Sequence, residues 1–194
     1  MAEPARRIVL LGCAGAGKTT LALRLGEAMG APVICLDAIW QPGWGPSEVD
    51  QFRQILAPAH AADAWISDGN FAMASFDIRL PRAELVVWLD RPRVWCAWRA
   101  ITRTFRRGEA HRPGDLIRVM RFIWAFDLIN RPRIEAVRLE HGAQVPVARL
   151  RNDREIAAFV EGLAEFRPPT SGPHPPPRYR RGRQSGVGAG EPGQ

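Results

Sequence analysis

A glycine-rich run near the N-terminus carries the clearest chemical signal in this sequence of 194 residues. Residues 12–19 read Gly-Cys-Ala-Gly-Ala-Gly-Lys-Thr and match the pattern G-x-x-x-x-G-K-S/T in full. Small residues let consecutive backbone N–H groups curl around phosphate oxygens, and the helix that follows adds the positive end of its dipole. The run therefore predicts a site for the phosphates of a nucleoside triphosphate.

The polar side chains of this loop have distinct predicted roles. We expect Lys18 to reach the β- and γ-phosphates and the Thr19 hydroxyl to ligate Mg²⁺, so that ATP and Mg²⁺ are the predicted ligands. Lys18 is the single lysine among 27 lysines and arginines, and a compact ammonium suits this position better than a planar guanidinium. The residues predicted to contact the nucleotide are Gly12, Cys13, Ala14, Gly15, Ala16, Gly17, Lys18, Thr19 and Thr20.

Three aspartates each follow a short apolar run, at Asp37, Asp68 and Asp90. In parallel sheets ligands collect at the carboxyl ends of the strands, so such acids are expected to face one cleft. We expect Asp68 to hold Mg²⁺ through water, because this ion keeps several waters and takes few carboxylates. Asp90 fits better as the N-cap of the next helix.

Apolar periodicity around these residues alternates between the patterns of strands and helices. Strands are predicted at residues 8–11, 32–36, 65–67, 85–89 and 144–150. Helices are predicted at 18–30, from Ser47 onward, at 92–108, at 115–129, after Pro132 and at 153–166. This alternation is typical of an α/β fold, with helices on both faces of a parallel sheet.

Beyond the glycine-rich loop, three further segments combine residues in a particular way. They are Leu36-Asp37 followed by Trp40-Gln41-Pro42-Gly43-Trp44, then residues 65–71, and residues 89–92 leading into Trp98-Arg99. With these segments the chain resembles the P-loop proteins called DNA topology modulation proteins, relatives of adenylate and shikimate kinases. The resemblance covers roughly residues 7–165. It implies a P-loop NTPase three-layer sandwich of nucleoside-monophosphate-kinase type, with a parallel five-stranded sheet in the order 2-3-1-4-5 and a lid.

The resemblance also implies roles for residues outside the loop. Shikimate-kinase-like proteins place an acid after the second strand to accept the proton of the acceptor hydroxyl, which predicts that role for Asp37; the alternative is a turn or N-cap aspartate. In helix 92–108, an apolar stripe of Val94, Trp98, Ile101 and Phe105 opposes an arginine stripe of Arg99, Arg103, Arg106 and Arg107. The arginines resemble the lid arginines of nucleoside monophosphate kinases, which predicts that Arg99 or Arg103 neutralises the transferring phosphoryl group; a solvated basic face is the alternative.

The segments on the acceptor side differ from those of adenylate kinases. There the third strand ends in Asp-Gly-Phe-Pro-Arg, whereas residues 68–72 here lack the proline and the arginine. Residues 38–60 hold one arginine, Arg53. These differences argue against AMP as the acceptor. Trp40 and Trp44 either form a wall of the acceptor pocket or pack to fix their loop.

The composition bounds the domain organisation. The chain is 46% hydrophobic and 24% charged, like a globular protein, and its formal net charge of +7 is uneven. Residues 167–194 hold seven prolines, six glycines, five arginines and one acid. We therefore expect a P-loop kinase-like domain at residues 1–166 and a disordered Arg/Pro/Gly-rich tail at residues 167–194.

The sequence also bears on location. No apolar run approaches the roughly 18 residues of a membrane helix, and residues 8–11 are too short a core for a signal peptide. The three cysteines, Cys13, Cys35 and Cys96, lack metal-ligand spacing, and their odd number argues against a disulfide framework. A cytoplasmic location is predicted.

Cys13 is either a reactive thiol or a small residue that fills space in the loop.

Together these observations predict a Mg²⁺-dependent kinase that transfers the γ-phosphoryl group of ATP to an unidentified hydroxyl or phosphate acceptor. The alternative is a nucleotide-binding regulator with weak ATPase activity that modulates DNA topology through basic surfaces. Because much of the positive charge lies in the tail, nucleic acid is the less favoured partner. The expected partners are a nucleoside triphosphate and a small-molecule acceptor, with no membrane.

Overall fold

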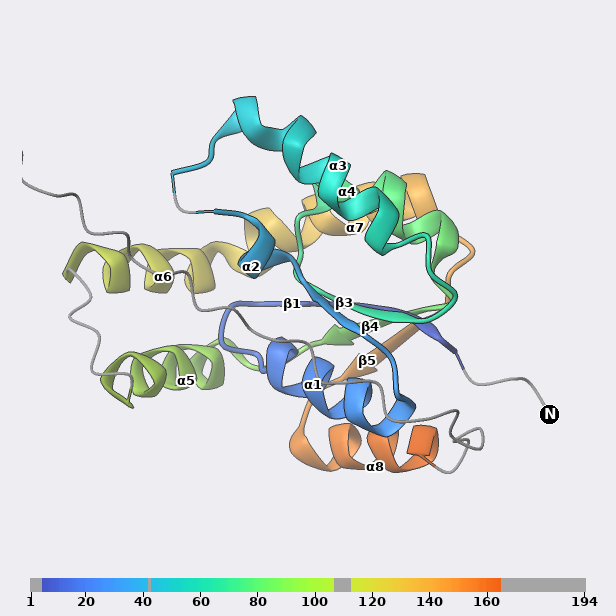
Figure 1. Cartoon of the computed structure of the whole chain (residues 1–194). Helices are drawn as coiled ribbons and strands as arrows, with labels where there is room; N and C mark the ends of the chain where they lie inside the picture. Colours follow the sequence, from blue (N-terminus) through green and yellow to red (C-terminus); the bar gives the residue numbers. More distant parts are fainter. Residues whose placement is uncertain (1–4, 42, 107–112, 165–194) are drawn as a thin grey trace, which may run out of the picture.

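Five parallel strands form the centre of the protein, in the order β2-β3-β1-β4-β5 (Figure 1). The structure, a computed structural model, describes residues 5–41, 43–106 and 113–164, and of residues 103–106, 113–115 and 164 it describes the backbone alone. The strands are β1 (Arg7–Gly12), β2 (Val33–Cys35), β3 (Trp65–Asp68), β4 (Leu85–Leu89) and β5 (Val147–Leu150). This sheet confirms the predicted fold class and strand order.

Helices cover both faces of the sheet and make three layers (Figure 1). Helices α1 (Lys18–Met29) and α8 (Asp153–Ala164) lie on one face, and α3 (Val49–Ala59), α4 (Ala72–Arg79) and α7 (Arg131–Gly142) on the other. Helices α5 (Arg93–Arg106) and α6 (Pro113–Ala125) extend beyond the end of the sheet where β1 leads into α1. The remaining turns are α2 (Leu36–Ile39), η1 (Pro46–Glu48), η2 (Leu80–Arg82) and the π-helical η3 (Phe126–Asn130). No helix in the described ranges is long and apolar enough to cross a membrane.

The central strands are buried along their length because helices cover them on both sides. Ile8, Val9, Leu10 and Leu11 of β1 have no exposed surface, and neither have Val86 and Val87 of β4. Parallel strands buried on both faces read as continuous apolar runs rather than alternating ones. The runs at residues 8–11 and 85–89 were therefore sufficient to predict these two strands.

Several predicted element boundaries differ from the structure. The strand predicted at 32–36 ends at Cys35, and Leu36 and Asp37 begin the short helix α2 instead. Helix α4 was not predicted, because its moderate amphipathicity follows directly on the turn after β3. The helix predicted at 115–129 becomes π-helical from Phe126. The predicted tail lies outside the described residues.

The apolar stripe of helix α5 is not the face that is buried. Val94 and Trp98 of that stripe are 72% and 62% exposed, whereas Cys96, Ala97 and Ala100 are buried. Small residues face inward because the backbone of α5 lies close to the phosphate loop at Gly15, and bulky side chains on that face would hold it away. Trp95 and Trp98 line a cavity instead.

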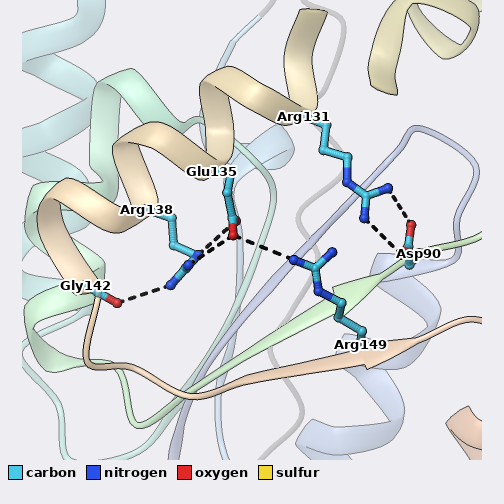
Figure 2. A network of polar contacts seen from close by, with 6 residues as sticks. All are labelled: Asp90, Arg131, Glu135, Arg138, Gly142 and Arg149. Atoms are coloured by element: carbon cyan, nitrogen blue, oxygen red, sulfur yellow. Dashed lines mark hydrogen bonds and ion pairs between the residues drawn. The ribbon is translucent and has the colours of Figure 1, made fainter. Parts of the chain in front are cut away.

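Ion pairs attach α7 to the ends of the last two strands (Figure 2). The Arg131 guanidinium donates to both oxygens of Asp90, at 2.8 and 3.0 Å. Glu135 accepts from Arg138 at 2.9 and 3.0 Å and lies 3.7 Å from Arg149 of β5. The Asp90 carboxylate, which the sequence analysis assigned to a helix cap, is thus held in an ion pair with Arg131.

A buried histidine connects α3 to the middle of the sheet. His60 has no exposed surface, and its Nδ1 and Nε2 lie 2.8 Å from the Leu56 carbonyl oxygen and 2.9 Å from Ser67 Oγ. A carbonyl only accepts, so Nδ1 carries the proton and Nε2 accepts from the Ser67 hydroxyl. Burial, together with the nearby positive charge of Arg79, lowers the pKa of His60 to about 4, against the weaker opposing effect of the Leu56 hydrogen bond.

We expect this histidine to make folding stability fall in mild acid. The unfolded chain binds the imidazole proton near pH 6.5 and the folded protein only near 4, so proton uptake between these values favours unfolding. The loss in the free energy of unfolding approaches about 3 kcal/mol at pH 4. Urea unfolding between pH 7.5 and 4 measures it, and a His60→Gln variant lacks this part of the slope. The half-buried His141 at the end of α7 gives the control, His141→Gln, which keeps the wild-type slope. Equal slopes in wild type and His60→Gln would contradict this expectation.

Candidate functional site

The phosphate loop joins β1 to α1 and needs glycine for two separate contacts. Gly12 and Gly15 have φ angles of 145° and 80°, a region that favours glycine. A Cβ atom on Gly12 would lie 2.7 Å from the Leu89 carbonyl oxygen, and one on Gly15 would lie 2.3 Å from that of Cys96. The loop backbone therefore lies directly against β4 at Gly12 and against α5 at Gly15. Neither position has space for a Cβ atom.

The ammonium of Lys18 lies inside the curve of this loop. Its Nζ donates to the carbonyl oxygens of Gly12, at 2.9 Å, and Cys13, at 3.0 Å. Burial lowers the pKa of Lys18, and the carboxylates of Asp68 and Asp37 act in the opposite direction. Lys18 is therefore held by weakly basic carbonyls that an anionic phosphate oxygen can replace.

Thr19 and Asp68, each predicted to hold Mg²⁺, are in contact with one another, and their metal binding stays a prediction. The Thr19 hydroxyl donates to Oδ2 of Asp68 at 2.6 Å, and Oδ1 of the same buried carboxylate has no hydrogen-bond partner. Burial raises the pKa of Asp68, while the Thr19 hydrogen bond and the Lys18 charge lower it. A hydroxyl beside a carboxylate with one free oxygen fits Mg²⁺. The described residues contain no group of three or more His, Cys, Asp or Glu that could by itself hold a metal ion.

Asn70 holds the first residue of the phosphate loop, a function that the sequence analysis did not assign. Its Oδ1 accepts from the Gly12 N–H at 3.1 Å, and its Nδ2 donates to the Gly12 carbonyl at 3.0 Å. The amide thereby satisfies both polar groups of one backbone residue. The sequence held a signal for this contact, namely an amide two residues after a strand that ends beside β1.

Arg79, at the end of α4, holds the turn that carries Asn70. This arginine has no exposed surface, and it donates to Ser67 Oγ at 3.0 Å, to the Gly69 carbonyl at 3.0 Å and to the Asn70 carbonyl at 2.6 Å. Burial lowers its pKa to about 9, which the negative charge of Asp68 partly opposes. No sequence signal pointed to Arg79, because its importance comes from contacts with another segment.

A cavity of about 970 Å³ opens beside the loop, and most of the predicted site residues line it. Its loop side is lined by Ala14, Gly15, Gly17, Lys18, Thr19 and Thr20. The exposed Asp37 and the Asn70–Phe71 pair line a second side. Trp95, Trp98, Arg99 and Thr102 of α5 and Phe122 of α6 complete it. Lys18, Thr19, Asp37 and Arg99 thus share one cavity, and Asp68 lies beneath it in contact with Thr19.

The two predicted lid arginines are only partly described. The Arg99 guanidinium lies over the phosphate loop, since a Cβ atom on Gly17 would meet its Nη1 at 3.7 Å. Arg103 follows one turn later on α5, where the structure describes the backbone alone. The structure therefore brings Arg99 to the loop, and the assignment of Arg103 stays a prediction. Arg106 lies in the same backbone-only part of α5, and Arg107 lies outside the described residues.

Trp40 and Trp44 pack against other aromatic rings. Trp40 lies 5.3 Å from Phe52, 5.7 Å from Trp44 and 5.8 Å from Phe71, measured between ring centroids. Of these four residues, Phe71 lines the cavity. The two tryptophans thus fix the loop between α2 and α3, which was one of the two interpretations of the sequence.

Cys13 is a small buried residue of the loop. Its thiol hydrogen-bonds with the Cys96 thiol, and this contact together with burial raises the pKa of Cys13 above its ordinary value. A neutral thiol is a weak nucleophile. The structure therefore favours the interpretation of Cys13 as a filler.

The Asn70 contact gives a testable expectation. Asn70→Ala removes both hydrogen bonds to Gly12, so we expect the free energy of unfolding to fall by about 1–3 kcal/mol and ATP affinity to weaken. Asn152→Ala is a matched control, because Asn152 accepts from the Glu155 N–H at the start of α8. It should cost about 1 kcal/mol as a lost cap and leave ATP affinity unchanged. Urea unfolding and calorimetric ATP titration measure both effects, and wild-type ATP affinity in Asn70→Ala would refute the assigned function of the amide.

Comparison with known proteins places this geometry in a known fold. No protein-family model matches the chain, and no curated protein matches its sequence, so its resemblance to DNA topology modulation proteins stays a prediction. Among solved structures it is similar to shikimate kinase from Acinetobacter baumannii in complex with shikimate (TM-score 0.56, 17% identity, covering 84% of this chain and 93% of that one). It is also similar to shikimate kinase from Bacteroides thetaiotaomicron (0.51, 20%, 84% and 98%) and a gluconokinase from Sinorhizobium meliloti 1021 (0.50, 18%, 84% and 96%). At these identities the likeness is one of fold, and the chain has the fold of P-loop kinases.

Proposed function

We propose that this protein is a Mg²⁺-dependent kinase that transfers the γ-phosphoryl group of ATP to a small-molecule acceptor. The observation that carries the proposal is the shared cavity, which Lys18 and Thr19 of the phosphate loop line together with Asp37. A phosphate-binding cation and a proton acceptor in one cavity are the parts that phosphoryl transfer requires. The P-loop kinase fold of the structural neighbours supports this proposal.

The triphosphate would bind along the loop. Backbone N–H groups of residues 12–20 and the N-terminus of α1 would contact its oxygens, with Lys18 leaving the loop carbonyls to bind the β- and γ-phosphates. Thr19 and, through water, Asp68 would hold Mg²⁺. The ion supplies charge neutralisation between the β- and γ-phosphates.

The acceptor would bind on the opposite side of the cavity. Asp37 would accept the proton of the attacking hydroxyl, and its exposed carboxylate in the first turn of α2 is free to approach a ligand. Arg99, already over Gly17, would neutralise the charge that develops on the transferring group, and Arg103 would assist from the next turn of α5. Closure of α5 and α6 over the cavity would exclude water.

The remaining expectations about the chain belong to this proposal. A kinase-like domain would span residues 1–166, with the segment 167–194 as a tail that does not contribute to catalysis. The cysteines Cys13, Cys35 and Cys96 form no disulfide within the part of the chain that the structure describes. The compartment would be the cytoplasm. The partners would be ATP and a small molecule.

Lys18→Ala tests the nucleotide site. We expect ATP·Mg²⁺ affinity to fall about 10- to 100-fold, because the variant loses charge-assisted hydrogen bonds to phosphate and the chain has no second lysine. Isothermal titration with ATP·Mg²⁺ measures the loss. Arg24→Ala removes an exposed cation from the same helix and serves as the control with wild-type affinity. Equal affinity in both variants would remove the basis of the proposed function.

Asp37→Asn tests the chemical step. The amide keeps the shape of the carboxylate and cannot accept the proton, so we expect ATP affinity to be retained and kcat to fall about 100-fold. ATP hydrolysis, with water in place of the acceptor, provides the rate. Asp50→Asn on α3 is the control, since Asp50 is exposed and does not line the cavity. A normal rate together with a lower melting temperature would identify Asp37 as a structural residue of α2 instead.

A further inference from the structure

Four aromatic side chains line the cavity together with the phosphate loop. They are Phe71, Trp95, Trp98 and Phe122, and Trp98 is 62% exposed. Aromatic faces bind planar or apolar rings by stacking and contribute little to the binding of a separate charged group. The cavity volume of about 970 Å³ is large enough for a second small molecule beside the triphosphate.

Arg53, the arginine of the segment between α2 and the end of α3, is committed to a structural ion pair. Its guanidinium donates to both oxygens of Asp77, at 2.9 and 2.6 Å, and to the Ala74 carbonyl at 3.1 Å. These contacts attach α3 to α4. Arg53 does not line the cavity. A phosphate group of the acceptor could therefore bind the Arg53 guanidinium only if the Arg53–Asp77 ion pair broke.

Arg79, another arginine of this part of the fold, is buried. Its Nη1 and Nη2 bind Ser67, Gly69 and Asn70 and so hold the turn after β3, while its buried Nε has no partner. To reach the cavity it would have to leave three hydrogen bonds and open the core. Among the described residues, the cations that line the cavity are Lys18 and Arg99, and both lie at the phosphate loop.

From these contacts we infer that the acceptor is an uncharged alcohol carried on a planar or apolar ring, such as a nucleoside, and not a nucleoside monophosphate or a hydroxy acid. The inference rests on the proposed kinase activity and names the substrate class of that same site. The ring would stack on Trp98 and its aromatic neighbours, which leaves the hydroxyl directed toward Asp37.

The transfer step balances with ATP as the only co-reactant. The acceptor oxygen forms a bond to the γ-phosphorus, and the bond from that phosphorus to the β–γ bridging oxygen breaks with its electron pair leaving on ADP. The hydroxyl proton passes to the Asp37 carboxylate. The products are ADP and the phosphate monoester of the ring alcohol.

The test is a comparison of acceptors with the full-length protein and ATP·Mg²⁺. Adenosine, cytidine and pyridoxine are the uncharged ring alcohols, and the 5′-monophosphates of the two nucleosides are their charged counterparts. Shikimate and gluconate represent hydroxy acids, and glucose represents an uncharged alcohol without a planar or apolar face. We expect kcat/KM to be at least about tenfold higher for the best ring alcohol than for every charged compound and for glucose.

The other outcomes are distinguishable. If the protein binds and hydrolyses ATP but prefers a monophosphate, a hydroxy acid or glucose, the inference is overturned and the proposed kinase stands. Transfer to none of the ring alcohols by a protein that hydrolyses ATP overturns it as well. Failure to bind ATP at all removes the proposed function itself.

Two tryptophans of similar exposure provide a matched pair of variants. Trp98 lines the cavity, whereas Trp124, on α6 and 57% exposed, does not. We expect Trp98→Ala to raise KM for the ring alcohol about tenfold with KM for ATP unchanged, and Trp124→Ala to change neither. An unaltered acceptor KM in Trp98→Ala, or equal effects of the two variants, would show that stacking at this wall does not hold the acceptor.

Discussion

The side-chain amide of Asn70 binds both backbone polar groups of Gly12, and the geometry of the whole site depends on this contact. It joins the carboxyl ends of β1 and β3, so the loop that would bind phosphate keeps a constant position relative to the buried Asp68. Thr19 donates a hydrogen bond to Asp68 at 2.6 Å. Because Asn70 also lines the cavity, the positions proposed for the phosphates, the metal ion and the acceptor would share one rigid reference.

Arg79 shows how the fold uses a buried charge to make that reference rigid. Removing a guanidinium from water is costly unless its donors find partners. Here Nη1 and Nη2 bind the Ser67 hydroxyl of β3 and two carbonyls of the turn that follows, while Nε has no partner. The Ser67 hydroxyl in turn donates to the neutral His60. These contacts make the turn rigid and also hold the charge of Arg79 away from the cavity.

Helix α5 connects the loop to the aromatic wall. A glycine at position 15 lets the helix backbone come into contact with the loop at Cys96, and the small residues Ala97 and Ala100 face inward beside it. This close approach leaves no inward space for the indole of Trp98, which turns to the cavity together with Arg99. Helix α5 therefore brings both a cation, Arg99, and aromatic side chains to the cavity in which we propose that ATP and the acceptor bind.

The sequence by itself determined the glycine-rich loop, the five strands of the sheet and the place of Asp68 at the end of β3. These features depend on local patterns: glycines where side chains cannot fit, apolar runs in buried strands, and acids at the ends of those strands. Only the tertiary structure decided which face of α5 packs inward, because that helix has two faces and the contact with Gly15 selects between them. It also decided the functions of Asn70 and Arg79, since hydrogen bonds between distant segments have no periodicity along the chain.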